Sequence, residues 1–214
     1  MKSLIFASLP ERSDDLDAHW KEYDPQFNLS EDKAGFYCEG GAYGLVLFTS
    51  RTMEMLWLLG FASWKAMYSY GGLLVKIHGE DKILDMKETS TMPDQAAFDK
   101  EYDRLIEQIY ELAKIENLND FKWPDGIPTP ETGRPSEEEE ALVFDLICMA
   151  TAYVFLHEVQ HIKFTRDGTT LSRLEEEMEC DRFARELMLT KLEECSGSYG
   201  WPVDKLRTKR GMSL

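Results

Sequence analysis

Cysteine and histidine are both scarce in this chain of 214 residues, with four of each. The cysteines are Cys38, Cys148, Cys180 and Cys195, and no two of them have the C-x-x-C spacing of a zinc ribbon or a redox motif. We therefore interpret them as free thiols of a protein that works in a reducing compartment.

Long apolar runs are missing as well. Residues 1–10 contain an apolar patch that is too short for the core of a signal peptide, and we expect a strand or a packing arm there. Residues 55–64 are apolar but flanked by charges, and they fall well short of the roughly 20 residues that a membrane span needs. The sequence thus predicts a cytoplasmic protein without a membrane partner.

Basic residues are few, with 24 lysines and arginines against 40 acidic residues and a net charge of −16. Such a field repels nucleic-acid phosphates, so nucleic acid is not expected as a partner, whereas protein substrates are compatible with it. The length suits one domain, which we place at residues 1–196. Residues 197–214 form a basic C-terminal tail. We favour a solvated tail over one that docks on an acidic surface of the same chain.

The chain alternates short strand patterns with long helical ones. We predict strands at residues 43–49 and 73–77, on either side of a buried helix at residues 53–70. An amphipathic helix opens at Asp94, and a long apolar helix follows at about residues 136–164. The expected fold class is therefore α+β, a mostly helical zincin-like domain with a small β-sheet beside the zinc-binding helix.

The most informative stretch is His157-Glu158-Val159-Gln160-His161, near the end of that long helix. Two histidines four residues apart project from the same face of a helix, so both imidazoles can bind one zinc ion. The glutamate between them can deprotonate a metal-bound water, as in a zinc metallopeptidase. We predict His157 and His161 as metal ligands and Glu158 as the catalytic base.

A second helix, predicted at residues 172–192, begins with a Ser172/Glu175 capping box. Its predicted inward stripe consists of Leu174, Glu177, Met178, Asp181, Ala184, Met188 and Leu192. Antiparallel packing brings Glu177 level with the histidines as a third ligand, with the fourth position open to water. Asp181 can then hold the free ring nitrogen of a histidine as a second-shell partner. If the stripe is shifted by one position, Glu176 is the ligand instead.

These two helices also resemble known proteins. The residues that carry the resemblance are His157, Glu158, His161, Glu177, Met178, Glu179, Cys180, Asp181, Phe183 and Ala184. They resemble the H-E-x-x-H plus E-x-x-x-D/N-x-F-A pattern of gluzincin-type metallopeptidases, although Cys180 stands where many gluzincins have alanine. The sequence most resembles the phage-exclusion protease Lit family, and the ImmA/IrrE-like regulatory proteases nearly as well. The match spans residues 153–188.

The resemblance to Lit-like proteins implies a cytoplasmic, zinc-dependent endopeptidase that cleaves an intracellular protein such as a translation factor during phage infection. The resemblance to ImmA/IrrE-like proteins implies a regulatory protease of a repressor. A non-catalytic metal-binding regulator is a third reading, and an activating partner protein or peptide is compatible with each. His78 and Tyr153 are candidates for the oxyanion donor by residue type alone. The strand at residues 43–49, or that at 73–77, could bind substrate by strand addition if it lies at an edge.

Overall fold

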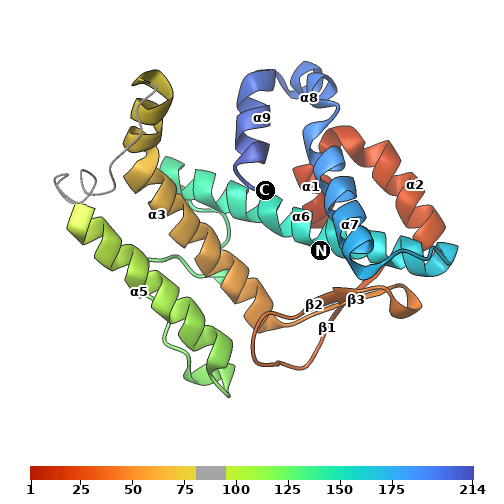
Figure 1. Cartoon of the computed structure of the whole chain (residues 1–214), viewed down its shortest axis with the longest axis horizontal. Coiled ribbons are helices and arrows are strands. Elements are labelled where there is room, and N and C mark those ends of the chain that lie inside the picture. The colour runs from red at the N-terminus through yellow and green to blue at the C-terminus, as the bar shows by residue number, and fades with distance from the viewer. Residues whose placement is uncertain (81–94) are drawn as a thin grey trace.

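A computed structural model describes residues 1–80 and 95–214 of the chain (Figure 1). Its main elements are, in order, α1 (Lys2–Ser8), α2 (Ser13–Tyr23), β1 (Gln26–Leu29), β2 (Cys38–Gly40), β3 (Leu45–Phe48), α3 (Ser50–Glu80), α5 (Gln95–Lys114), α6 (Glu138–Asp167), α7 (Arg173–Leu189), α8 (Leu192–Tyr199) and α9 (Val203–Gly211). The fold is α+β and mostly helical with one small sheet, which confirms the predicted fold class.

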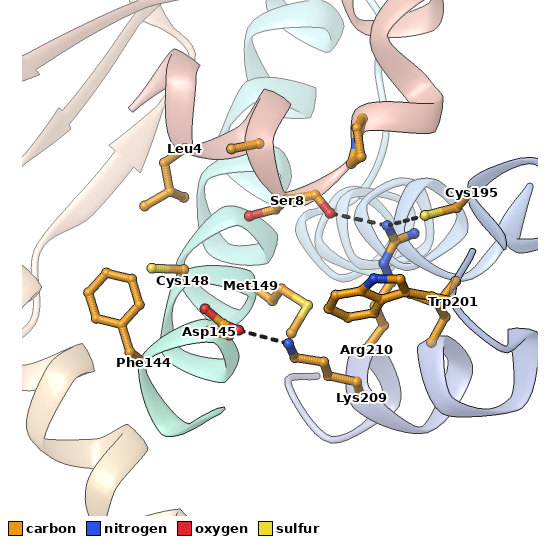
Figure 2. A pocket seen from close by; sticks show the side chains of 13 residues that line it. Leu4, Ser8, Phe144, Asp145, Cys148, Met149, Cys195, Trp201, Lys209 and Arg210 are labelled. Atoms are coloured by element: carbon orange, nitrogen blue, oxygen red, sulfur yellow. Dashed lines mark hydrogen bonds and ion pairs between the residues drawn. The ribbon is translucent and has the colours of Figure 1, made fainter. Parts of the chain in front are cut away.

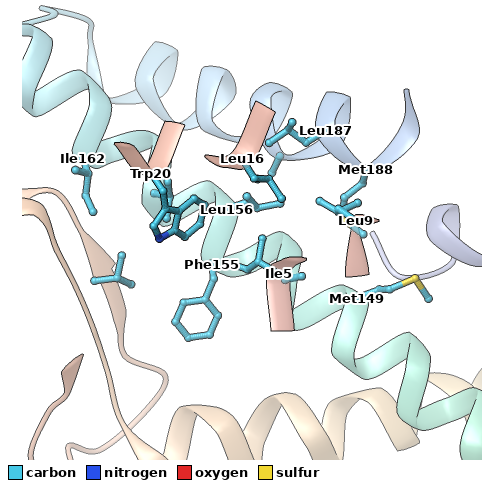
Figure 3. Close-up of a cluster of buried hydrophobic side chains, with 14 of the residues drawn as sticks. Ile5, Leu9, Leu16, Trp20, Met149, Phe155, Leu156, Ile162, Leu187 and Met188 are labelled. Carbon is cyan, nitrogen blue, oxygen red and sulfur yellow. The ribbon is translucent and has the colours of Figure 1, made fainter. Parts of the chain in front are cut away.

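Helix α6 runs through the centre of the molecule. Several of its side chains are fully buried, among them Phe155, Leu156 and Ile162. Helices α1, α3 and α7 pack against it, and Figure 3 shows its side chains meeting those of α1, α2 and α7. By length and hydropathy alone α6 could cross a membrane, but a helix at the centre of a core passes the same test. It ends at Gly168, which adopts a left-handed conformation.

The sheet has the order β1-β3-β2, so β3 is its central strand. Strand β3 pairs parallel with β1 and antiparallel with β2. Its Val46 and Phe48 are buried, and Phe48 meets Phe155 of α6 edge to face with ring centroids 5.1 Å apart. The predicted strand at residues 43–49 thus exists as Leu45–Phe48, but it cannot receive a substrate strand because both of its edges are already paired. The edge strand beside α6 is β2.

The predicted strand at residues 73–77 is wrong, because α3 continues through Gly71 to Glu80. A glycine pair weakens a helix by roughly 1 kcal/mol per residue relative to alanine. Packing against α5 supports the helix at this point. Lys65 Nζ lies 2.7 Å from Glu101 Oε1, and the Tyr70 hydroxyl donates to Asp99 at 2.9 Å.

The N-terminal patch forms helix α1 and not a strand. A helix of this length is unstable alone. Ile5 and Leu9 lie four residues apart on one side of it, and both are fully buried against the core. The alternative of a packing arm therefore describes residues 1–10 better than the strand.

The C-terminal residues fold back onto the domain, so the favoured solvated tail is wrong. Helix α9 buries Leu206 and Arg210. The Arg210 guanidinium forms an ion pair with Glu11 and donates to the main-chain carbonyls of Ser8 at 3.1 Å and Met188 at 3.0 Å. The side chains of Arg210 and Glu11 are only 3% and 1% exposed. A buried charge requires such a partner, and the acidic side chain belongs to the same chain.

Candidate metal centre

Helices α6 and α7 form an antiparallel pair joined by a short turn. The predicted capping box starts α7: Ser172 Oγ accepts from the Glu175 amide at 3.4 Å, and the Glu175 carboxylate accepts from the Ser172 amide at 2.9 Å. This turn sets the register in which the end of α6 faces the start of α7. As a result, the histidines of one helix face the carboxylates of the other.

Three donor atoms converge between the two helices. The Nε2 atoms of His157 and His161 are 3.2 Å apart. Glu177 Oε2 lies 3.2 Å from His157 Nε2 and 3.9 Å from His161 Nε2. Ligands placed about 2.0–2.1 Å from a tetrahedral zinc ion lie about 3.3 Å from one another. The three atoms therefore have the spacing of ligands to one metal ion of that size.

The other ring nitrogen of each histidine faces a carboxylate. His157 Nδ1 lies 2.8 Å from Asp181 Oδ1, and His161 Nδ1 lies 2.7 Å from Glu176 Oε1. When each Nδ1 donates its proton to the neighbouring carboxylate, each Nε2 presents a lone pair toward the other donor atoms. Two lone pairs and a carboxylate oxygen that face one another need a cation between them. The donor set thus fits a metal ion by its chemistry as well as its spacing.

Glu176 has a place that the sequence did not suggest. The sequence offers Glu176 only as an alternative ligand. In the structure its carboxylate contacts Nδ1 of His161, just as the Asp181 carboxylate contacts Nδ1 of His157. Adjacent residues of α7 therefore contact opposite sides of the His161 ring. The need of His161 Nδ1 for its own carboxylate partner is the signal that points to Glu176 in the sequence.

Glu158 lies on the side of α6 that faces the sheet. Its Oε2 accepts a hydrogen bond from the main-chain amide of Gly40 in β2 at 2.7 Å. Burial raises the pKa of Glu158 above its ordinary value, while the Gly40 amide and the two histidines act in the opposite direction. A Cβ atom on Gly40 would lie 2.2 Å from the Glu158 carbonyl oxygen, so only glycine fits here. Gly40 was not among the predicted site residues, because in sequence the Gly40–Gly41 pair indicates only the boundary of the strand predicted at residues 43–49.

Two thiols lie close to these residues. The Sγ of Cys180 and one ring nitrogen of each histidine lie within 4.8 Å of one another. Burial, followed by the surrounding carboxylates, raises the pKa of Cys180 to about 12. Burial likewise raises the pKa of Cys38, which is close to Glu158, to about 12. Each thiol therefore keeps its proton at neutral pH, and a metal ion must displace that proton to bind the sulfur.

Tyr153 lies one turn before His157 on α6, and its hydroxyl donates to Asp181 Oδ1 at 3.0 Å. Burial raises the pKa of Tyr153 to about 12, so the hydroxyl keeps its proton. It contacts the carboxylate on the Nδ1 side of His157, away from the converging Nε2 atoms. Tyr153 is thus placed to position Asp181 and not to reach an oxyanion. His78 is among residues 72–80, whose side chains lie outside the described part of the structure.

The predicted inward stripe of α7 is partly wrong. Leu174 and Met178 are 71% and 62% exposed. The buried residues of this helix are Cys180, Ala184, Leu187 and Met188. The contact face is therefore rotated from the prediction, and Glu177 and Asp181 lie at its border, with their side chains 45% and 56% exposed. The converging donor atoms are open to solvent on this side.

A cavity of about 500 Å³ lies between α1, α6 and the C-terminal helices (Figure 2). Its lining includes Phe144, Cys148 and Trp201, and an ion pair of 2.9 Å joins Asp145 to Lys209 at its wall. None of the residues around the two histidines lines it. The candidate metal centre is thus separate from this cavity.

The two packed helices of this mostly helical α+β domain bring together histidines and carboxylates, which are side chains that bind metal ions. The family model of Peptidase U49 matches residues 46–213, which include both helices. The chain therefore belongs to the Peptidase U49 family and is a peptidase, with protein as its substrate. No curated protein and no solved structure gives a significant match.

Proposed function

We propose that this peptidase is a zinc-dependent endopeptidase. The observation that carries the proposal is the convergence of His157 Nε2, His161 Nε2 and Glu177 Oε2 at 3.2–3.9 Å from one another. When bound, zinc lowers the pKa of a coordinated water and polarises the scissile carbonyl. We assign Glu177 as the third ligand in preference to Cys180, because its Oε2 lies 3.2 and 3.9 Å from the two Nε2 atoms, the spacing of ligands of one zinc ion, whereas the Cys180 side chain is fully buried in the helix interface.

The two outer carboxylates keep the histidines in the tautomer that binds metal. Asp181 and Glu176 each accept from an Nδ1 proton, which orients the ring and leaves Nε2 free. Tyr153 donates to Asp181 and holds it in place. This arrangement supports the assignment of Asp181 as a second-shell residue and adds Glu176 to it.

Glu158 is the general base in this proposal. Its carboxylate accepts a proton from the attacking water and then transfers it to the leaving amine as the C–N bond breaks. A raised pKa suits a carboxylate that must hold a proton between these two steps. The Gly40 amide holds one oxygen of the group in position.

The Lit-like resemblance supports a finer proposal, in which the enzyme is a cytoplasmic anti-phage protease that cleaves a translation factor, with or without an activating partner. The ImmA/IrrE-like alternative is a protease of a repressor. In the third alternative the centre binds zinc without catalysis. The net charge of −16 supports a protein substrate over nucleic acid or an anionic membrane.

Zinc content and proteolysis, measured on the same variants, test the proposal. We expect about one zinc per chain in the wild type and in Glu158→Gln, and little in His161→Ala. Of these three proteins, only the wild type should create new protein termini in a cell lysate. Glu179→Gln is a matched control, since Glu179 lies on α7 but pairs with Arg182 on the solvent side. A wild type that cannot be loaded with zinc would refute the zinc assignment. A zinc-loaded Glu158→Gln variant as active as the wild type would refute the base.

A further inference from the structure

Two large apolar side chains of α7 are exposed beside the metal centre. Leu174 and Met178 are 71% and 62% exposed, although they lie four residues apart on one helix. At 3.6 residues per turn, positions 174, 177, 178 and 181 share one side of α7. Leu174 and Met178 therefore adjoin Glu177 and Asp181.

The fold itself does not need these two side chains. Helix α7 is held against α6 by the buried residues Cys180, Ala184, Leu187 and Met188, and its first turn is fixed by the capping box. Single exposed apolar residues are common on protein surfaces, but a pair that borders a site points to an interaction. The pair borders the exposed side chains of Glu177 and Asp181, which contact the histidines from the solvent side.

The charges around the pair indicate the chemistry of its occupant. The chain has a net charge of −16, and α7, with six acidic residues and three arginines, shares this excess of negative charge. We propose that Leu174 and Met178 form the docking surface for the substrate, and that they bind apolar side chains of a protein segment that also carries lysine or arginine. This inference rests on the proposed function and names the substrate class of that site.

A second copy of this chain is the less suitable occupant. A symmetric dimer through α7 would bring two acidic helices together, each on a protein with a net charge of −16. Like charges at such a contact oppose association. A cationic segment with apolar side chains satisfies both the charge and the exposed apolar surface.

The test uses the double variant Leu174→Gln/Met178→Gln. Glutamine forms helices about as well as leucine and methionine, so α7 should be retained. The control is Leu59→Gln, the same substitution at a leucine of α3 that is 48% exposed. Zinc content and the thermal midpoint of both proteins should equal those of the wild type. The single variants serve if the double variant is unstable.

Binding is measured by fluorescence anisotropy on the zinc-loaded full chain carrying Glu158→Gln, with dye-labelled peptides that are not cleaved in this background. The three peptides have equal length and combine lysine with leucine, lysine with serine, or glutamate with leucine. We expect the lysine–leucine peptide to bind at least about tenfold more tightly than the other two. The double variant should reduce its advantage over the lysine–serine peptide to about twofold, and Leu59→Gln should leave it unchanged.

Two outcomes overturn the docking surface. One is a double variant that keeps the full preference for leucine. The other is self-association of the wild type, measured by sedimentation velocity, that the double variant abolishes, because the occupant is then a second copy. Cleavage of the same peptides by the wild type tests the proposed function separately. If the wild type cleaves the peptides without preferring the apolar one, the docking surface is refuted and the endopeptidase function is not. If it binds the lysine–leucine peptide selectively but cleaves none of the peptides, the endopeptidase function is refuted and the docking surface is not.

Discussion

Replacing Gly40 by alanine should impair proton transfer while the metal ligands stay in place. A Cβ atom at residue 40 would lie 2.2 Å from the carbonyl oxygen of Glu158, a main-chain atom of α6 that cannot rotate away. Strand β2 must retreat by about 1.2 Å to reach an ordinary contact of 3.4 Å. The backbone of Gly40 is not left-handed, so the effect comes from this contact alone.

The same movement removes a hydrogen bond. The Gly40 amide lies 2.7 Å from Glu158 Oε2, and a retreat of about 1.2 Å takes it beyond hydrogen-bond distance. A misplacement of about 1 Å at a catalytic group can lower the rate by about 10²-fold. Overpacking should also destabilise the protein by about 1–3 kcal/mol, and each kcal/mol lowers the melting temperature by about 2–4 °C in a chain of this size.

The pH profile gives a separate readout. The Gly40 amide lowers the pKa of Glu158, so its loss raises that pKa further. The base acts when ionised, and the acidic limb of kcat/KM should therefore move to higher pH. The assay is hydrolysis of a fluorogenic peptide from pH 5 to 9, with zinc content and melting temperature measured on the same samples.

Two further glycines provide matched controls. Gly60→Ala places a Cβ atom 2.2 Å from Ile147 Cγ1 in the core, so it should lower stability without changing zinc content or the acidic limb. Gly71→Ala meets no described atom within 4 Å and should be neutral, or stabilising by up to about 1 kcal/mol. The reasoning is refuted if Gly40→Ala keeps kcat/KM within about threefold of the wild type with an unshifted acidic limb.

Three other changes test separate parts of the structure. Asp181→Asn removes the anionic acceptor of His157 Nδ1 and should weaken zinc binding about 10–100-fold in a chelator competition; unchanged affinity would count against this role. Arg210→Met leaves the buried carboxylate of Glu11 unpaired and should cost about 3–5 kcal/mol in urea unfolding, whereas a loss below about 1 kcal/mol contradicts the ion pair's importance. Burial lowers the pKa of His19 from 6.5 to about 4, so below pH 6.5 the unfolded chain binds a proton that the folded chain does not. The free energy of unfolding should therefore fall by about 1–2 kcal/mol between pH 7 and 5, after allowance for the partial exposure of His19. The His19→Leu variant should show a smaller dependence of this free energy on pH. An equal dependence in the variant would show that another group is responsible.

The residues of the candidate metal centre could be predicted from the sequence because they repeat at helical spacing on two helices joined by a short turn. The structure brings together His157, His161, Glu177 and Asp181 as that spacing suggested. The rotation of α7 about its own axis was harder to predict. The apolar residues Leu174 and Met178 drew the predicted stripe toward the solvent side, since periodicity does not distinguish an apolar residue of the core from one at a binding surface.

The fold departs from the sequence prediction where packing overrides local preference. Gly71–Gly72 followed by the apolar residues 73–77 favours a turn and a strand, yet α3 continues to Glu80, and α5 packs against the turns before the glycines through Asp99 and Glu101. Residues 203–211 have little apolar periodicity, but Leu206 packs on Leu192 and Cys195 of α8, and Arg210 forms a buried ion pair with Glu11 at the other end of the chain. Neither partner can be identified from the local sequence.

The proposed base and the proposed metal ligands differ in how the chain positions them. The histidines depend on contacts between neighbouring helices, at sequence separations of 15–24 residues. Glu158 depends on the Gly40 amide, which is 118 residues away in sequence, and no helical repeat reveals that contact. Strand β2 can thus move without displacing the carboxylates of α7. It follows that zinc affinity and proton transfer should respond to different substitutions, α7 governing the first and β2 the second.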